Sequence, residues 1–129
     1  MDKVQYWLDL ADDDVITAKW LLSGERLLAM GFFCHLVVEK ALKAAIVYNT
    51  EETPPKIHDL KELAKRGNVA SDISEEQRLL FGKLMPLHID GRYPEYKERI
   101  EKTLNVEKCK IILSETEDFL CWIKQKLGK

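Results

Sequence analysis

The apolar residues of the N-terminal segment recur at steps of three and four, which is the spacing of one face of an α-helix. They are Val4, Trp7, Leu8, Ala11, Val15, Ala18 and Leu22. We expect this helix to end near Ser23 and Gly24, because glycine commonly follows the last helical turn. A second helix is expected from Glu25 or Leu27 to Tyr48, and it is apolar nearly all round, which predicts an interior position.

A loop and a short helix are predicted next. Residues 49–56 contain two prolines, which lack backbone donors and push the residues before them out of the helical region. This stretch is therefore expected to be a surface loop. The following segment, HDLKELAKRG, predicts a short helix that has Leu60, Leu63 and Ala64 facing inward and that ends at Gly67.

The C-terminal half predicts two further helices. The sequence SEEQ at 74–77 is a capping box that opens a helix, which we expect to run up to Pro86. Residues 86–100 are expected to be irregular because of their proline and glycine content. Asn105 is expected to cap the last helix. Its apolar face comprises Cys109, Ile112, Leu113, Thr116, Phe119, Leu120, Ile123 and Leu127.

No segment alternates apolar and polar residues in the manner of a strand. The pattern predicts an all-α protein, an up-and-down bundle of four to five helices. The 129 residues are enough for one domain, and 46% of them are hydrophobic, so we expect residues 1–129 to fold around a single core.

Composition excludes few functions. The net charge of −2 gives no broad attraction to nucleic acid or anionic membranes, although a local basic pocket is compatible with it. Cys34, Cys109 and Cys121 lack the spacing of a zinc site, so no metal and no cofactor is expected, and buried thiols fit a reducing compartment. The N-terminus lacks the pattern of a signal peptide, and the longest apolar run is broken by charges, so we expect a cytoplasmic protein without membrane contact.

The most apolar segment, FFCHLVVEKALKAAIV at 32–47, also carries ionisable residues. His35, Glu39 and Lys43 are spaced i, i+4, i+8 and form one polar stripe, while Lys40 lies about 100° away around the helix. One interpretation is a solvated edge on which Glu39 and Lys43 form a surface pair worth about 0.3–0.5 kcal/mol. The other is a cleft or subunit interface, where a buried carboxylate needs a partner.

Three motifs in this order resemble the HEPN domain family (higher eukaryotes and prokaryotes nucleotide-binding) over nearly the whole chain. The first is VEKALKA at Val38–Ala44, the second is the P-x-x-HDL of Pro55–Leu60, and the third is RYP at Arg92–Pro94. The resemblance implies a helical bundle that often dimerises. It also implies a minimal nucleotidyltransferase as partner, in a toxin–antitoxin-like system, and a nucleotide or RNA as ligand.

The resemblance leaves enzymatic activity open. Many related domains are metal-independent ribonucleases marked by arginine, four to six intervening residues, and histidine. This chain has no histidine at that distance after an arginine. We expect a domain without this catalysis. The alternatives are a divergent ribonuclease toxin that uses His35, or His88 with Arg92, and a helical interaction module without a ligand.

Candidate site residues follow from these motifs. Arg92 suits bidentate phosphate binding, and Tyr93 offers a ring for a base, but Arg92 could equally pair with Glu39 and pin its loop to the bundle. His58 and His88 are candidates for ligand or interface contacts, although a packing role is the simpler interpretation of each. We predict that the stripe of His35, Glu39 and Lys43 faces a polar cleft shared with the Arg92 loop, or a dimer interface, rather than bulk water.

Overall fold

A computed structural model describes residues 2–89 and 93–129, and all regular secondary structure in these ranges is helical. No strand occurs within these ranges, so the prediction of an all-α bundle is confirmed. The elements are α1 (Lys3–Ser23), α2 (Leu27–Thr50), α3 (Leu60–Arg66), a 3₁₀ helix (Ala70–Asp72), α4 (Glu75–Ile89), α5 (Pro94–Thr103) and α6 (Val106–Lys126).

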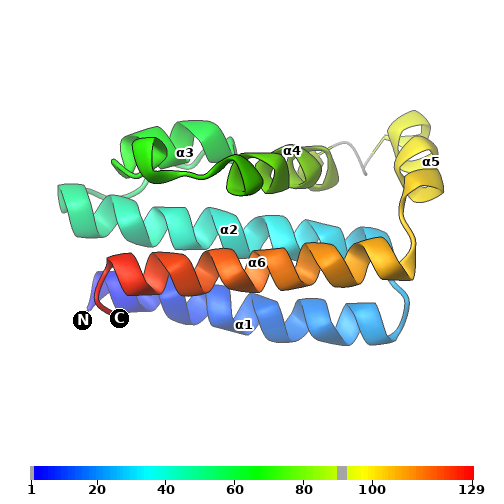
Figure 1. The fold of residues 1–129 in the computed structure, drawn as a ribbon, viewed down its shortest axis with the longest axis horizontal. Coiled ribbons are helices and arrows are strands. Elements are labelled where there is room, and N and C mark those ends of the chain that lie inside the picture. The colour runs from blue at the N-terminus through cyan, green and yellow to red at the C-terminus, as the bar shows by residue number, and fades with distance from the viewer. Residues whose placement is uncertain (1, 90–92) are drawn as a thin grey trace.

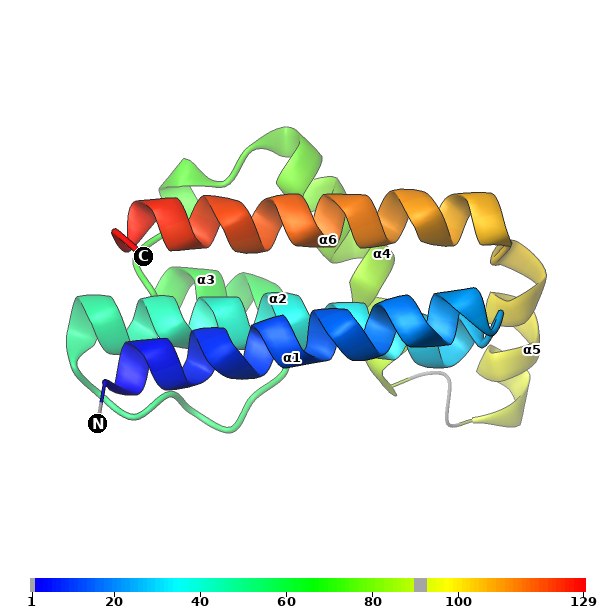
Figure 2. The same ribbon diagram turned by 90° about the horizontal axis from the view of Figure 1, so that it is seen from below.

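Helices α1, α2 and α6 lie side by side along the long axis of the molecule, and α4 crosses α2 and α6 at a steep angle in Figure 2. Helices α3 and α5 lie at opposite ends of the bundle (Figures 1 and 2). Helix α2 packs against α1, α3, α4, α5 and α6. This central position explains why α2 is apolar nearly all round, whereas α1 and α6 each have one apolar face.

Most predicted helix starts and ends are confirmed, but α2 continues to Thr50 instead of ending at Tyr48, so the first two residues of the predicted loop at 49–56 are helical. In the capping box, Ser74 N–H donates to Gln77 Oε1 at 2.9 Å and Gln77 N–H donates to Ser74 Oγ at 3.1 Å. Asn105 caps α6 by accepting from Lys108 N–H at 2.8 Å. Helix α1 ends at Ser23 and α3 is followed by Gly67, as expected.

The prediction that residues 86–100 are irregular is wrong for the described part of that range. Helix α4 continues through Pro86 to Ile89. Leu84 and Leu87 on either side are buried in the core, and this packing outweighs the hydrogen bond that proline cannot donate. Helix α5 begins at Pro94, a position in the first turn where a backbone donor is not needed.

Helices α2 and α4 approach closely at Gly31. A Cβ atom on Gly31 would lie 2.6 Å from Leu87 Cδ1, so a larger residue at this position would require Leu87 to move. The close packing places the residue after Leu87, His88, beside the polar stripe of α2. Among the described residues, no helix is both long and apolar enough to cross a membrane.

Candidate functional site

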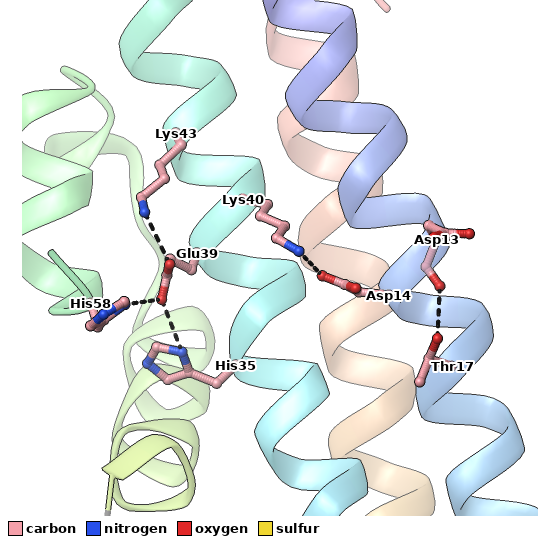
Figure 3. A network of polar contacts seen from close by, with 8 residues as sticks. All are labelled: Asp13, Asp14, Thr17, His35, Glu39, Lys40, Lys43 and His58. Carbon is pink, nitrogen blue, oxygen red and sulfur yellow. Dashed lines mark hydrogen bonds and ion pairs between the residues drawn. The ribbon is translucent and has the colours of Figure 1, made fainter. Parts of the chain in front are cut away.

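The polar stripe of α2 is buried. The exposed fractions of His35, Glu39 and Lys43 are 1%, 4% and 7%, so the interpretation as a solvated edge is wrong. The stripe faces the segment before α3 and the end of α4, as Figure 3 shows for its contacts with His58. A carboxylate in this position is tolerated only if its oxygens are hydrogen-bonded.

Glu39 has partners on both carboxylate oxygens. Lys43 Nζ donates to Oε2 at 3.0 Å, and His58 Nδ1 lies 3.0 Å from Oε1. Burial raises the pKa of Glu39, but the hydrogen bonds from His58 and Lys43 outweigh it and hold this pKa below its ordinary value. The carboxylate is therefore ionised at neutral pH and accepts from His58. Lys43 Nζ also lies 5.6 Å from the centre of the Trp7 ring.

His58 is fixed by its neighbours in the P-x-x-HDL motif. Ile57 packs against the core and Leu60 is buried, so the backbone on both sides of His58 is anchored. Asp59 is the N-cap of α3 rather than a residue of its first turn, and its side chain accepts from the N–H groups of Lys61 and Glu62 at 3.0 and 3.2 Å. The His58 side chain is half exposed, so it joins the buried carboxylate to the surface.

Three imidazole rings pack together around this carboxylate. The ring centre of His88 lies 4.5 Å from that of His35, 4.3 Å from that of His58 and 5.3 Å from that of Phe32. Burial and the neighbouring His88 lower the pKa of His35 to about 4, so its ring is neutral at pH 7. His35 Nδ1 is buried, lies 3.5 Å from Glu39 Oε1, and makes no hydrogen bond with the described residues.

The same residues could hold a cation. One nitrogen or oxygen atom from each of His35, Glu39 and His88 lies within 4.8 Å of the others. Two imidazoles and a carboxylate are a donor set that suits divalent transition metals.

Lys40 contacts a different helix from the other ionisable residues of this apolar segment of α2. It points toward α1, where its Nζ forms an ion pair with Asp14 at 2.5 Å (Figure 3). The ionisable residues of the apolar segment therefore divide between two sides of α2. His35, Glu39 and Lys43 face the region of α3 and α4, while Lys40 holds α1 to α2.

His35, Glu39, His58 and His88 form a cluster of polar side chains. A cleft of about 580 Å³ opens beside this cluster, between the start of α2, the end of α4 and α5. Arg26, Phe32, His88 and Lys97 all line it, so His88 belongs to both the cleft and the cluster. Acidic groups are present too, because Lys97 Nζ lies 3.9 Å from Glu101 Oε1. The cleft offers an aromatic ring and two cationic side chains to a ligand.

Of the two remaining predicted site residues, the structure describes only Tyr93. Tyr93 is 58% exposed, and its ring centre lies 6.3 Å from that of Tyr96 rather than in the cluster. Arg92 lies outside the described residues, so its pairing with Glu39 and its share in a cleft stay predictions. Sequence reasoning did not predict the contact between His58 and Glu39. The sequence feature that could have indicated this contact is the P-x-x-HDL motif, which places the histidine directly before a capped helix.

Comparisons with known proteins bear on the chain as a whole. A protein-family model described as HEPN domain matches residues 4–126. Searches of curated proteins and of solved structures returned no match.

Proposed function

The chain belongs to the HEPN domain family, and from that premise we propose that it binds a nucleotide or RNA and works as a dimer with a minimal nucleotidyltransferase, in a toxin–antitoxin-like pair. The observation that carries the ligand proposal is the meeting of two motifs at one site. VEKALKA supplies Glu39 and Lys43, the P-x-x-HDL motif supplies His58, and the cleft beside them reaches the cluster through His88. We also propose a cytoplasmic location, as expected from the sequence.

The cleft has the size and chemistry for this ligand. Its volume of about 580 Å³ falls in the range of small-molecule sites. The Arg26 guanidinium can hold two phosphate oxygens at once, and Lys97 adds a second cation. Phe32 is partly buried in the same cleft and offers a ring on which a base can stack.

Calorimetric titration with ATP, other nucleotides and a short single-stranded RNA tests this proposal. We expect Arg26→Ala to weaken binding about tenfold or more, because a charge-assisted hydrogen bond contributes roughly 1.5–3 kcal/mol. Arg92→Ala tests the third motif in the same way. Arg78→Ala is the matched control, because Arg78 is an exposed arginine that does not line the cleft and should leave affinity unchanged. Absence of binding, or equal losses in all three variants, would contradict a nucleotide site in this cleft.

The proposed dimer and partner require an available apolar surface. Ile16 and Trp20 lie one turn apart on α1 and are 56% and 73% exposed. Co-expression with a minimal nucleotidyltransferase from the same genome, followed by light scattering of the purified complex, tests the partnership. We expect a stable complex, and a chain that stays monomeric and purifies alone would contradict this part of the proposal.

A divergent ribonuclease is the second candidate, and the pairing of His58 with Glu39 favours it. A half-exposed imidazole oriented by a buried carboxylate is the arrangement of a general base. If this candidate is correct, purified protein cleaves RNA in the presence of a chelator, and His58→Ala abolishes cleavage. If the wild-type chain leaves RNA intact, the ribonuclease candidate is contradicted and only the binding proposal remains.

A further inference from the structure

The fold gathers all three histidines of the chain around one buried glutamate. His35 and Glu39 lie on consecutive turns of α2, His58 precedes α3, and His88 lies in the last turn of α4. The sequence spacing of these residues predicts no metal site. Their convergence depends on the packing of α4 against α2 and on the loop that leads into α3.

Three of these residues bring potential metal ligands close together. One ligand atom from each of His35, Glu39 and His88 lies within 4.8 Å of the others. Zinc binds nitrogen and oxygen at about 2.0–2.2 Å, so a small contraction of the side chains would place all three around one ion. His35 Nδ1 is buried, lies 3.5 Å from Glu39 Oε1 and has no hydrogen bond from the described residues, so its lone pair is positioned to ligate an ion between the two side chains.

The two oxygens of Glu39 have different surroundings. Oε2 accepts from Lys43, which balances the charge of the carboxylate and fixes its orientation. Oε1 faces the histidines and accepts from His58. A carboxylate oxygen has a second lone pair, so Oε1 can ligate an ion while keeping its hydrogen bond from His58. The half-exposed ring of His58 marks the surface side of the cluster, from which an ion would enter.

We propose that His35, Glu39 and His88 form a binding site for one divalent transition-metal cation of the zinc type, and that His58 positions the carboxylate. Three protein ligands leave one position of a tetrahedral ion for water or for a ligand atom from the adjoining cleft. A hydrogen bond to a ligating carboxylate is an outer-shell contact of the kind that tunes metal affinity. Metal binding by these residues would not require a bound nucleotide, since all of the ligands come from the cluster itself.

Titration with Co²⁺, followed by visible absorption, tests the site in the full-length chain after treatment with a chelator. The background is Cys121→Ser, which removes the exposed thiol as a competing ligand. We expect one Co²⁺ per chain with the intense bands of a low-coordinate site, displaced by Zn²⁺. We expect His88→Ala to weaken binding by more than about 100-fold and His58→Ala by roughly tenfold, the scale of an outer-shell contact. Glu76→Gln, which changes an exposed acidic residue of α4 outside the cluster, should leave affinity unchanged.

Several results would overturn the proposal. They are the absence of binding, binding that disappears in the Cys121→Ser background, and binding that His88→Ala leaves intact. Circular dichroism checks that each variant is folded. If His88→Ala fails to fold, X-ray absorption of the cobalt-loaded Cys121→Ser protein decides. Imidazole scattering from two ligands supports the site, whereas sulfur ligands or oxygen ligands alone contradict it.

Discussion

Glu39 Oε1 lies 3.0 Å from His58 Nδ1, and this contact ties the central helix of the bundle to the start of α3. The glutamate is buried while the histidine is half exposed, so the pair connects the interior to the surface. Lys43 completes the arrangement on the other carboxylate oxygen. Any change to one member leaves charge or hydrogen-bonding capacity unmatched in the interior.

Glu39→Gln is expected to destabilise the fold by about 2–4 kcal/mol. Removing one partner of a buried ion pair leaves the other charge, here that of Lys43, without compensation. Urea denaturation monitored by circular dichroism measures the loss. Glu98→Gln is the matched control, because Glu98 pairs with Lys102 on an exposed surface of α5 and should change stability by less than about 1 kcal/mol. Equal effects of the two substitutions would contradict the importance of the buried pair.

His35 is expected to make the metal-free protein less stable as the pH falls below neutral. Its pKa is lowered from 6.5 to about 4 by burial and by His88, against the opposing charge of Glu39. The unfolded chain therefore takes up a proton on His35 that the folded chain excludes, so stability is complete above about pH 6.5 and declines toward pH 4, by up to roughly 3 kcal/mol.

Urea denaturation between about pH 7 and pH 5, with a chelator present, measures this dependence. The range stays above the ordinary glutamate pKa of 4.5, and the pKa of Glu39 in the folded state is lower still, so Glu39 contributes little to the slope. His35→Gln should flatten the dependence on pH. A slope that is the same in this variant and in the wild type would show that His35 does not cause it.

The different surroundings of Gly31 and Gly82 predict opposite effects of substituting these two glycines. Gly31→Leu should destabilise the protein by about 1–3 kcal/mol, because its side chain would force α2 and α4 apart. Gly82 lies in α4 with no atom within 4 Å of its missing Cβ, so Gly82→Ala should stabilise the helix by roughly 0.5–1 kcal/mol. Thermal unfolding of both variants tests the difference, and a tolerated Gly31→Leu would contradict the close approach.

The cysteines are expected to differ sharply in reactivity. Burial raises the pKa of Cys34 to about 12 and also raises that of Cys109, whereas Cys121 is exposed. Because the thiolate is the reactive form, a thiol reagent at neutral pH should modify Cys121 alone in the folded chain. Peptide mass spectrometry identifies the modified sites, with urea-unfolded protein as the control in which all three react. Rapid modification of Cys34 in the folded protein would contradict its burial.

The helical pattern could be predicted because periodicity and capping are local. Ser74, Gln77 and Asn105 act within one turn, so their roles are readable from adjacent residues. The path of the chain through Pro86 was not predictable in this way, because burial of Leu84 and Leu87 against other helices decides it. The partner of Glu39 likewise comes from a separate segment, so the sequence indicated that this carboxylate needs a partner but not that His58 supplies it.

The central position of α2 also predicts the order in which the helices unfold locally. Helix α5 has one buried residue, Ile100, so it can detach while the rest of the bundle stays intact. Helix α2 packs on every other α-helix of the described chain, and exposing its amides means breaking all of those interfaces at once. The slowest hydrogen exchange should therefore lie in α2. This helix carries His35 and Glu39, so these two residues of the polar cluster belong to the part of the molecule that unfolds last.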